Sequence, residues 1–319
     1  RTAGGEAERP YDVAGWTLPM QMGVRARPVH SIREAPSERR LTLVRDWDDA
    51  RSSMGLPTSR RLDARSAIEN PTAQSGARLA LYKSWTNSMD EGWTRYVFDT
   101  FNVKYDTLLD RDVRAGNLRA RFDVIVLPSM RLREIVEGRS KETAPAEFTG
   151  GITEAGVEAL RRFVEEGGTL VCFDASTEFA IKRLGVPLRN VLEGVRSSDF
   201  YCPGSVLRLD VDTASPLARG LARATDAYFI NSSAFDLATD SEKGVRVVAR
   251  YAERDVLRSG WLLGERYVAG KIALAEYTRG KGRIVLFGFR PQHRGQTWGT
   301  LPFLWNAISA GAQGAGTTD

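Results

Sequence analysis

The chain has 319 residues and a mass of 35.3 kDa, with 42% hydrophobic and 27% charged residues. At about 100 to 200 residues per domain, this length allows one large domain, or one domain with a substantial extension. The ordinary globular composition excludes collagen-like, wholly disordered and disulfide-scaffold proteins. Its longest apolar runs are strand-sized and fall short of the ~20 residues of a membrane helix, so we expect no membrane span.

The positive charge is concentrated near the N-terminus. Lys and Arg total 45 against 40 acids, and most of the net charge of +5 falls between Arg25 and Arg65. Such a segment suits a polyanion-binding tail or a solvated connector, and we favour the connector. We therefore expect no nucleic-acid partner.

Residues 1–76 lack the pattern of a compact domain, because short apolar patches alternate with spacers rich in Pro, Ser, Gly and Arg. The apolar patch at residues 11–24 has no evident core of its own and is suited to docking on a partner chain or a second copy. The expected parts are an N-terminal segment at 1–30, a charged connector at 31–76, an α/β domain at 77–309 and a flexible tail at 310–319.

Strands and helices alternate from Ala77 onward. The expected elements are a strand at 78–84, a helix at 93–101, a strand at 104–109, a short helix capped by Asp110, a buried strand ending at Pro128, a helix capped by Thr153 and a buried strand at 169–176. Strands follow at 206–210, 227–231, 245–251, 259–264, 271–277 and 283–289, and a closing helix at 300–308. This order predicts a doubly wound, mostly parallel, flavodoxin-like three-layer α/β fold with its ligand crevice at the carboxyl ends of the strands.

The turn after "TLVCFDAS" is where such a sheet presents a nucleophile. Here the chain resembles the class I glutamine amidotransferase-like fold, whose active members carry a Gly-x-Cys-x-Gly elbow and a later His-Pro-Glu. "LVCFDAST" puts Asp174 at the nucleophile position and Ser176 at the second glycine. "LFGFRPQ" puts Arg290 in place of His and Gln292 in place of Glu. The resemblance implies a catalytically degenerate module with no catalytic residues.

The altered residues suggest two roles for the crevice. Asp174 and Arg290 could form a salt bridge across it or bind a polar ligand, and Arg290 would suit a carboxylate. His293 is the best single candidate for proton transfer or ligand contact, the alternative being a histidine bonded to loop backbone. Asp90 and Glu91 also fit an N-cap and a first-turn acid. The candidate crevice residues are Ser84, Asp90, Glu91, Ser129, Asp174, Ser176, Arg290, Gln292 and His293.

Cysteine and histidine are too sparse for a metal centre. Cys172 and Cys202 allow one disulfide or none, and we expect both to be structural. His30 and His293 are the only histidines, and no His-x-x-Glu spacing occurs. We therefore expect neither a metal site nor a cofactor in this chain.

Several longer strings resemble the C-terminal region of bacterial zinc carboxypeptidase A-like peptidases, over most of residues 10 to 308. They include "PYDVAGWTLPMQMGV", "SWTNSMDEGWTRYVFD" and "LFGFRPQHRGQTWGT". The resemblance implies an accessory module for substrate access, ligand binding or assembly beside a preceding or separate peptidase domain, which would hold the zinc. It also implies export from a bacterial cell.

Two other functions stay open. One is a stand-alone structural or interaction subunit of a larger complex, which would use residues 11–24. The other is an independent hydrolase that uses Asp174, Ser176 and His293.

Overall fold

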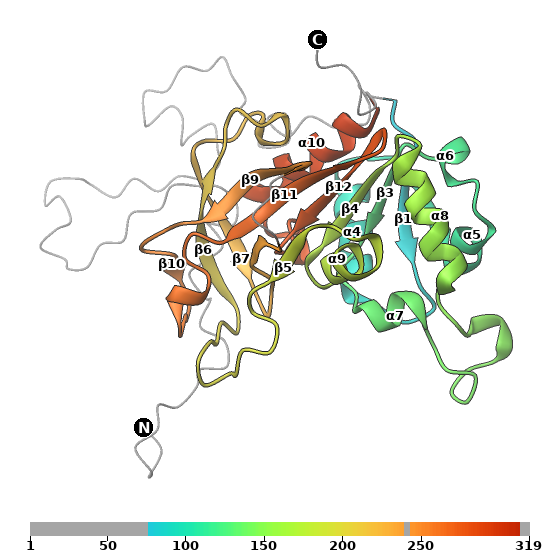
Figure 1. The fold of residues 1–319 in the computed structure, drawn as a ribbon, viewed down its shortest axis with the longest axis horizontal. Helices are drawn as coiled ribbons and strands as arrows, with labels where there is room; N and C mark the ends of the chain where they lie inside the picture. The colour runs from blue at the N-terminus through green and yellow to red at the C-terminus, as the bar shows by residue number, and fades with distance from the viewer. Residues whose placement is uncertain (1–75, 239–242, 313–319) are drawn as a thin grey trace, which may run out of the picture. The chain divides into compact units, whose positions relative to one another are not determined.

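The computed structural model describes residues 76–238 and 243–312. The expected N-terminal segment, the connector and the docking patch at 11–24 lie outside the described residues, and they stay predictions. The described residues form one continuous sheet of twelve strands with helices against it (Figure 1).

The centre of the sheet is parallel. Its order is β12 (Gly282–Phe287), β4 (Thr169–Phe173), β3 (Val124–Leu127), β1 (Leu79–Lys83) and β2 (Asp106–Leu109), and every neighbouring pair is parallel. All residues of β3 and β4 are buried. Their continuous apolar runs are what strands covered on both faces require.

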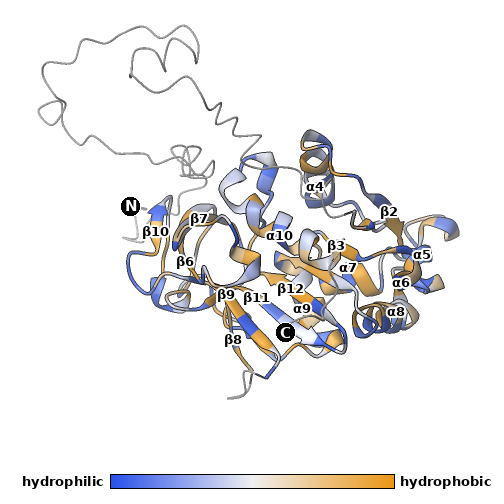
Figure 2. Cartoon of the chain, turned by 90° about the horizontal axis from the view of Figure 1, so that it is seen from above, coloured by the Kyte–Doolittle hydropathy of each residue, from blue (hydrophilic) through white to orange (hydrophobic). Residues whose placement is uncertain are grey.

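Helices cover both faces of this parallel centre. They are α4 (Met89–Thr100), α5 (Asp110–Ala115), α6 (Leu118–Arg121), α7 (Leu132–Val136), α8 (Thr153–Glu165), α9 (Thr177–Leu184) and α10 (Leu301–Ala312). In Figure 2, α4 and α10 lie on one side of the sheet, and α8 and α9 on the other. Because residues alternate across β4, Leu170 and Cys172 join the core with Phe163 of α8 and Phe179 of α9.

The other half of the sheet is antiparallel. Next to β12 comes β11, which pairs with β9, followed by β6, whose other neighbours are β7 and β10. Two short strands, β5 and β8, pair with each other, and β8 also pairs with β11. The bounds are β5 (Leu188–Asn190), β6 (Ser205–Val211), β7 (Ala224–Phe229), β8 (Phe235–Leu237), β9 (Val245–Tyr251), β10 (Leu257–Ser259) and β11 (Ile272–Arg279).

The structure moves the expected start of one helix. Helix α4 begins at Met89, four residues before the expected Trp93, and Ser88 rather than Asp90 is its N-cap. The Ser88 hydroxyl accepts a hydrogen bond from the Glu91 amide at 3.2 Å, which satisfies an otherwise unpaired donor of the first turn. Asp90 and Glu91 lie within that turn as acids favoured by the helix dipole.

Two further expected caps are not caps. Leu109 is the N-cap of α5, and Asp110 is the first helical residue, with a buried carboxylate that accepts from the Tyr82 hydroxyl and the Trp85 amide. Ile152 stands at the N-cap of α8, and no side chain there makes a capping hydrogen bond. Thr153 instead has a positive φ of 57°.

One expected strand is mostly a loop. Of residues 259–264, only Ser259 belongs to a strand, and Leu263 makes an isolated bridge to Tyr201. Gly260 and Gly264 have φ values of +104° and +78°, which strand residues do not adopt. The expected closing helix, α10, runs to Ala312.

Candidate functional site

The turn after β4 has the geometry of an elbow. Strand β4 ends at Phe173, a short 3₁₀ turn covers Asp174–Ser176, and α9 follows at once. Asp174 has a φ of +48°, an uncommon conformation for a residue with a side chain, and is only 1% exposed. Strand, strained turn and helix in this order form the arrangement that presents a nucleophile in α/β-hydrolase enzymes. Here the position carries a carboxylate.

Arg290, three residues after the end of β12 at Phe287, holds this carboxylate in an ion pair. Its Nη1 lies 2.5 Å from Asp174 Oδ2, and its Nε lies 3.0 Å from Asp90 Oδ2. Nη1 also donates to the Ile230 carbonyl at 3.0 Å. The Ser129 hydroxyl donates to Asp174 Oδ2 at 3.3 Å. The salt bridge predicted between Asp174 and Arg290 is confirmed, with Asp90 as a second partner.

The cluster carries more negative than positive charge. Burial raises the pKa of Asp174 to about 7, against the opposing effect of Arg290, and Asp90 raises it further. The carboxylates of Asp174 and Asp90 outweigh the effect of burial on Arg290 and raise the pKa of its guanidinium. Asp174 Oδ1 is buried without a hydrogen-bond partner. A ligand carboxylate would have to compete with two carboxylates for Arg290, so this arrangement does not favour the expected anion site.

Gln292 and His293 border the cluster without completing a catalytic arrangement. The Gln292 amide donates to Thr94 Oγ1 at 3.0 Å and lies 3.5 Å from the Asp90 carbonyl. His293 stacks on Tyr228, with ring centroids 4.3 Å apart. Burial, with smaller contributions from Arg290 and Arg294, lowers the pKa of His293 to about 3. His293 is therefore a neutral, packed side chain at pH 7.

The remaining predicted residues are engaged elsewhere. The buried Ser176 hydroxyl lies 2.9 Å from the Phe173 carbonyl and 3.1 Å from that of Leu127, both acceptors. Ser84 donates to Asp110 at 3.4 Å, and Glu91 pairs with Arg95. Of the predicted residues, the structure thus joins Asp90, Ser129, Asp174 and Arg290 in one cluster, with Gln292 and His293 beside it.

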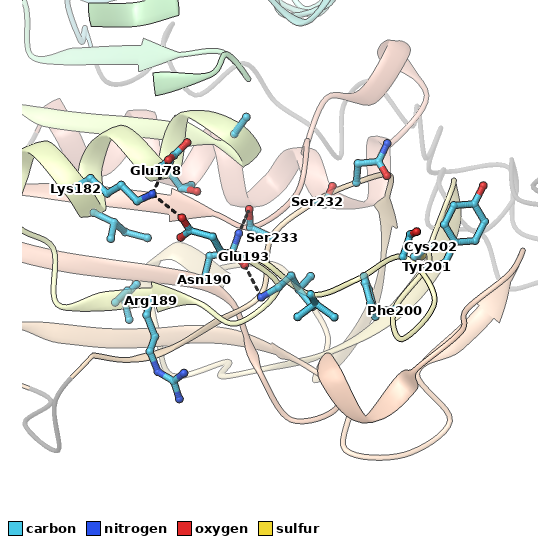
Figure 3. Close-up of a pocket in the computed structure, with 18 residues that line it drawn as sticks. Glu178, Lys182, Arg189, Asn190, Glu193, Phe200, Tyr201, Cys202, Ser232 and Ser233 are labelled. Atoms are coloured by element: carbon cyan, nitrogen blue, oxygen red, sulfur yellow. Dashed lines mark hydrogen bonds and ion pairs between the residues drawn. The ribbon is translucent and has the colours of Figure 1, made fainter. Parts of the chain in front are cut away.

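A cavity of about 660 Å³ lies next to the elbow (Figure 3). Two of its lining residues, Ala175 and Ser232, adjoin Asp174, the first in sequence and the second through its hydroxyl. Glu178 and Lys182 of α9, Asn190 of β5, and Glu193 and Phe200 of the following loop also line it. The sequence analysis missed these residues, because no motif links segments so far apart in the chain.

Neither cysteine offers an alternative nucleophile. Cys172 and Cys202 are unbridged and buried. Burial raises the pKa of both thiols, that of Cys202 to about 12, so thiolates are disfavoured at neutral pH.

The described residues hold neither a metal-binding group nor a membrane-spanning helix. Residues 76–238 and 243–312 contain no group of three or more His, Cys, Asp or Glu that could hold a metal ion. No helix in these two ranges is long and apolar enough to cross a membrane.

No protein-family model matches the sequence, and no curated protein matches it significantly. Solved structures with a related fold include a putative GMP synthase protein from Thermoplasma acidophilum, with a TM-score of 0.47 and 10% identity over 74% of this chain and 95% of that one. A glutamine amidotransferase from Thermotoga maritima has a TM-score of 0.43 and 12% identity, over 70% of this chain and 80% of that one. A β-galactosidase from Bacillus circulans gives 0.40 and 15%, over 69% of this chain and 30% of that one.

Likenesses this distant transfer no activity, substrate or partner. The structure itself shows the parallel centre of the sheet, its helical layers and the elbow after β4. The fold is therefore the expected three-layer α/β fold, with helices on both faces of parallel strands.

Proposed function

We propose that this chain is a catalytically inactive amidotransferase-like module that binds a small polar ligand beside its elbow. The observation that carries the proposal is the buried ion pair of Asp174 and Arg290 at the place of a nucleophile and its base. An arginine is always charged and accepts no proton, so it cannot activate a nucleophile. The nearest thiol, Cys172, lies inside β4 and is fully buried.

The adjoining cavity supports the binding role. Its volume of about 660 Å³ falls within the range of small-molecule sites, roughly 300–1,000 Å³. It also combines apolar walls with a few polar groups, as such sites usually do.

Absence of turnover and presence of binding test the proposal together. We expect the isolated chain to hydrolyse neither glutamine, nitrophenyl esters nor peptides above the rate of a buffer blank. We expect at least one compound in a screen of small polar molecules to bind the chain and raise its Tm. Turnover by the wild type that is lost in both Asp174→Asn and His293→Ala would support the hydrolase and contradict the proposal.

We further propose that the module works as an accessory part of a larger exported bacterial assembly, beside a zinc carboxypeptidase that holds the metal. The support is the resemblance of its longer sequence strings. Intact-mass measurement and peptide mapping of the protein from its source cells test this. A His-x-x-Glu segment upstream, or a copurifying peptidase, is expected. A native chain that begins near Arg1 and purifies alone would contradict it.

A specific observation also favours an interaction subunit. Met89, Trp93 and Tyr96 lie on one face of α4 and are 82%, 36% and 54% exposed. Exposed apolar side chains grouped in this way often mark contact surfaces. If they do here, sedimentation of the wild type will show a partner or a second copy bound, and Tyr96→Glu will release it.

A further inference from the structure

The cavity beside the elbow has a negatively charged end. Lys182 Nζ lies 2.8 Å from Glu178 Oε1 and 2.6 Å from Glu193 Oε1, so one ammonium is shared by two carboxylates. All three residues line the cavity, and Figure 3 shows them together. The group carries a net charge of about −1 at neutral pH. The second oxygen of each carboxylate makes no hydrogen bond within the described ranges and can accept one from a ligand.

Arg189, another cationic residue among those that line the cavity, does not offset this negative charge. Arg189 lies 3.3 Å from Asp236, and its side chain points away from the cavity in Figure 3. Asp236 also pairs with Lys271 at 2.7 Å. The guanidinium is therefore occupied outside the cavity, whereas the carboxylates of Glu178 and Glu193 remain at its edge.

The cavity wall is held in shape by its own hydrogen bonds. Asn190 Oδ1 accepts from the amides of Leu192 and Ala234, and its Nδ2 donates to Ser233 Oγ. Asn190 therefore holds the cavity wall in shape, and its side chain has little hydrogen-bonding capacity left for a ligand. Beyond Ser232 lies Asp174, a buried carboxylate whose Oδ1 has no hydrogen-bond partner.

Apolar side chains also line the cavity. They belong to α9 and to the loop after β5, and comprise Ile181, Leu192, Val195 and Phe200. Phe200 is fixed by edge contacts with Phe229 and Tyr267, at centroid distances of 5.9 and 6.2 Å. A compact apolar group can pack here without rearranging the wall.

We propose that the cavity binds a small molecule with a protonated primary amino group and a compact apolar body. The ammonium would donate to the free oxygens of Glu178 and Glu193, and the apolar body would lie toward Phe200. Charge-assisted hydrogen bonds to two carboxylates, whose side chains are 41% and 60% exposed, favour a cation over a neutral or anionic molecule of equal shape. This inference rests on the proposed function, because it assumes that the module binds a ligand here.

Three probes of one shape test the charge preference. Phenethylamine, phenethyl alcohol and 3-phenylpropionate share a ring and a short chain and differ mainly in charge. Binding to the full chain is followed by backbone amide shifts, with those of Ala175, Glu193 and Ser232 reporting the cavity. We expect phenethylamine to bind about tenfold tighter than the alcohol, and the propionate to bind weakest. Raising the salt from about 0.05 to 0.5 M should weaken the binding of phenethylamine, because salt screens its attraction to the carboxylates, and should leave the alcohol unchanged.

A matched pair of variants assigns the effect to the charged end. Glu193→Gln removes one carboxylate whose side chain is 60% exposed, so the fold is expected to persist. The variant should bind phenethylamine at least about threefold more weakly than the wild type and bind the alcohol with unchanged affinity. Glu137→Gln removes an equally exposed partner of Arg133 on α7, outside the lining, and should change neither.

The outcomes separate the two proposals. Equal binding of amine and alcohol, or no effect of Glu193→Gln, overturns the amine specificity while the binding role stands. Amide shifts that avoid the cavity also overturn it. If no molecule in the wider screen binds the chain at all, the proposed function itself is contradicted.

Discussion

The strands in the two halves of the sheet are buried to different extents. In the parallel half, β3 and β4 are buried along their whole length, between helices on both faces. In the antiparallel half, β6 and β9 each contain half-buried or exposed residues among their buried ones. The candidate site lies where the halves meet. Asp90 and Asp174 come from the parallel half, and the loop at Ile230 from the antiparallel half. Arg290, following the strand that both halves share, ties them together.

Arg290→Leu should break that junction with the largest effect. Removing the guanidinium leaves Asp174 buried without its counter-charge, which costs about 3–5 kcal/mol of unfolding free energy in comparable buried pairs. Urea unfolding of the purified variant measures the loss. The surface variant Arg133→Leu, whose side chain is 85% exposed, should stay within about 0.5 kcal/mol of the wild type.

A second substitution identifies the cause of this loss. If the unpaired carboxylate is responsible, Asp174→Asn added to Arg290→Leu will recover part of the lost stability. A double variant no more stable than Arg290→Leu alone would mean that lost packing, rather than charge, dominates the junction.

Core truncations compare the two halves directly. Leu170 in β4 and Leu207 in β6 are each fully buried, so Leu170→Ala and Leu207→Ala should each cost about 2–5 kcal/mol. Because β11 and β12 join the halves through a continuous ladder, we expect one cooperative transition in both variants. Calorimetry that resolves two transitions, only one of them shifted by each variant, would show that the halves unfold separately.

The parallel half was the easier half to predict from the sequence. Continuous apolar runs such as "VIVL" and "TLVCF" fit few environments other than strands buried on both faces, and the elbow follows the second of them. Asp174 and Arg290 could be paired because the resemblance to the amidotransferase motifs puts them at the positions of the nucleophile and its histidine. Their neighbour Asp90 was placed in the crevice, but its bond to Arg290 depends on a helix start that Ser88 sets.

The cavity could not be predicted from sequence in the same way. Its polar lining consists of ordinary residues from α9, β5 and two loops, and only the folded chain brings Glu178, Glu193 and Ser232 together. The apolar run "SGWLLG" misled for a related reason. The run lies in a loop closed by the Ser205 hydroxyl against Trp261, and it leaves Trp261 and Leu263 38% and 40% exposed.

Two groups at the junction should give opposite pH dependences. The pKa of Asp174 rises from 3.8 to about 7 on folding, so its stabilising protonation is complete below pH 3.8 and lost as the pH rises to 7. The pKa of His293 falls from 6.5 to about 3, so its contribution is present above pH 6.5 and lost as the pH falls toward 3. Between about pH 4 and 6.5 the two slopes oppose each other.

Unfolding titrations of single variants separate these slopes. Relative to wild type, Asp174→Asn should gain stability with rising pH, by up to about 1.4 kcal/mol per unit between pH 4 and 7. Relative to wild type, His293→Gln should lose stability as the pH rises from about 4 to 6.5, because only the wild type gains the contribution of the neutral histidine. Differences that do not vary with pH in either variant would contradict the assigned pKa values.

The smallest expected loss of stability compares Ser88, which caps α4, with Thr153, which was expected to cap α8 but does not. Ser88→Ala removes the hydroxyl that accepts from the Glu91 amide and also contacts the Ser129 carbonyl at 3.3 Å, so it should cost about 1 kcal/mol. Thr153→Ala removes a hydroxyl that makes no capping bond at α8 and should cost less than about 0.5 kcal/mol. Equal losses of stability in both variants would mean that the first turn of α4 is held by packing against the sheet rather than by its cap.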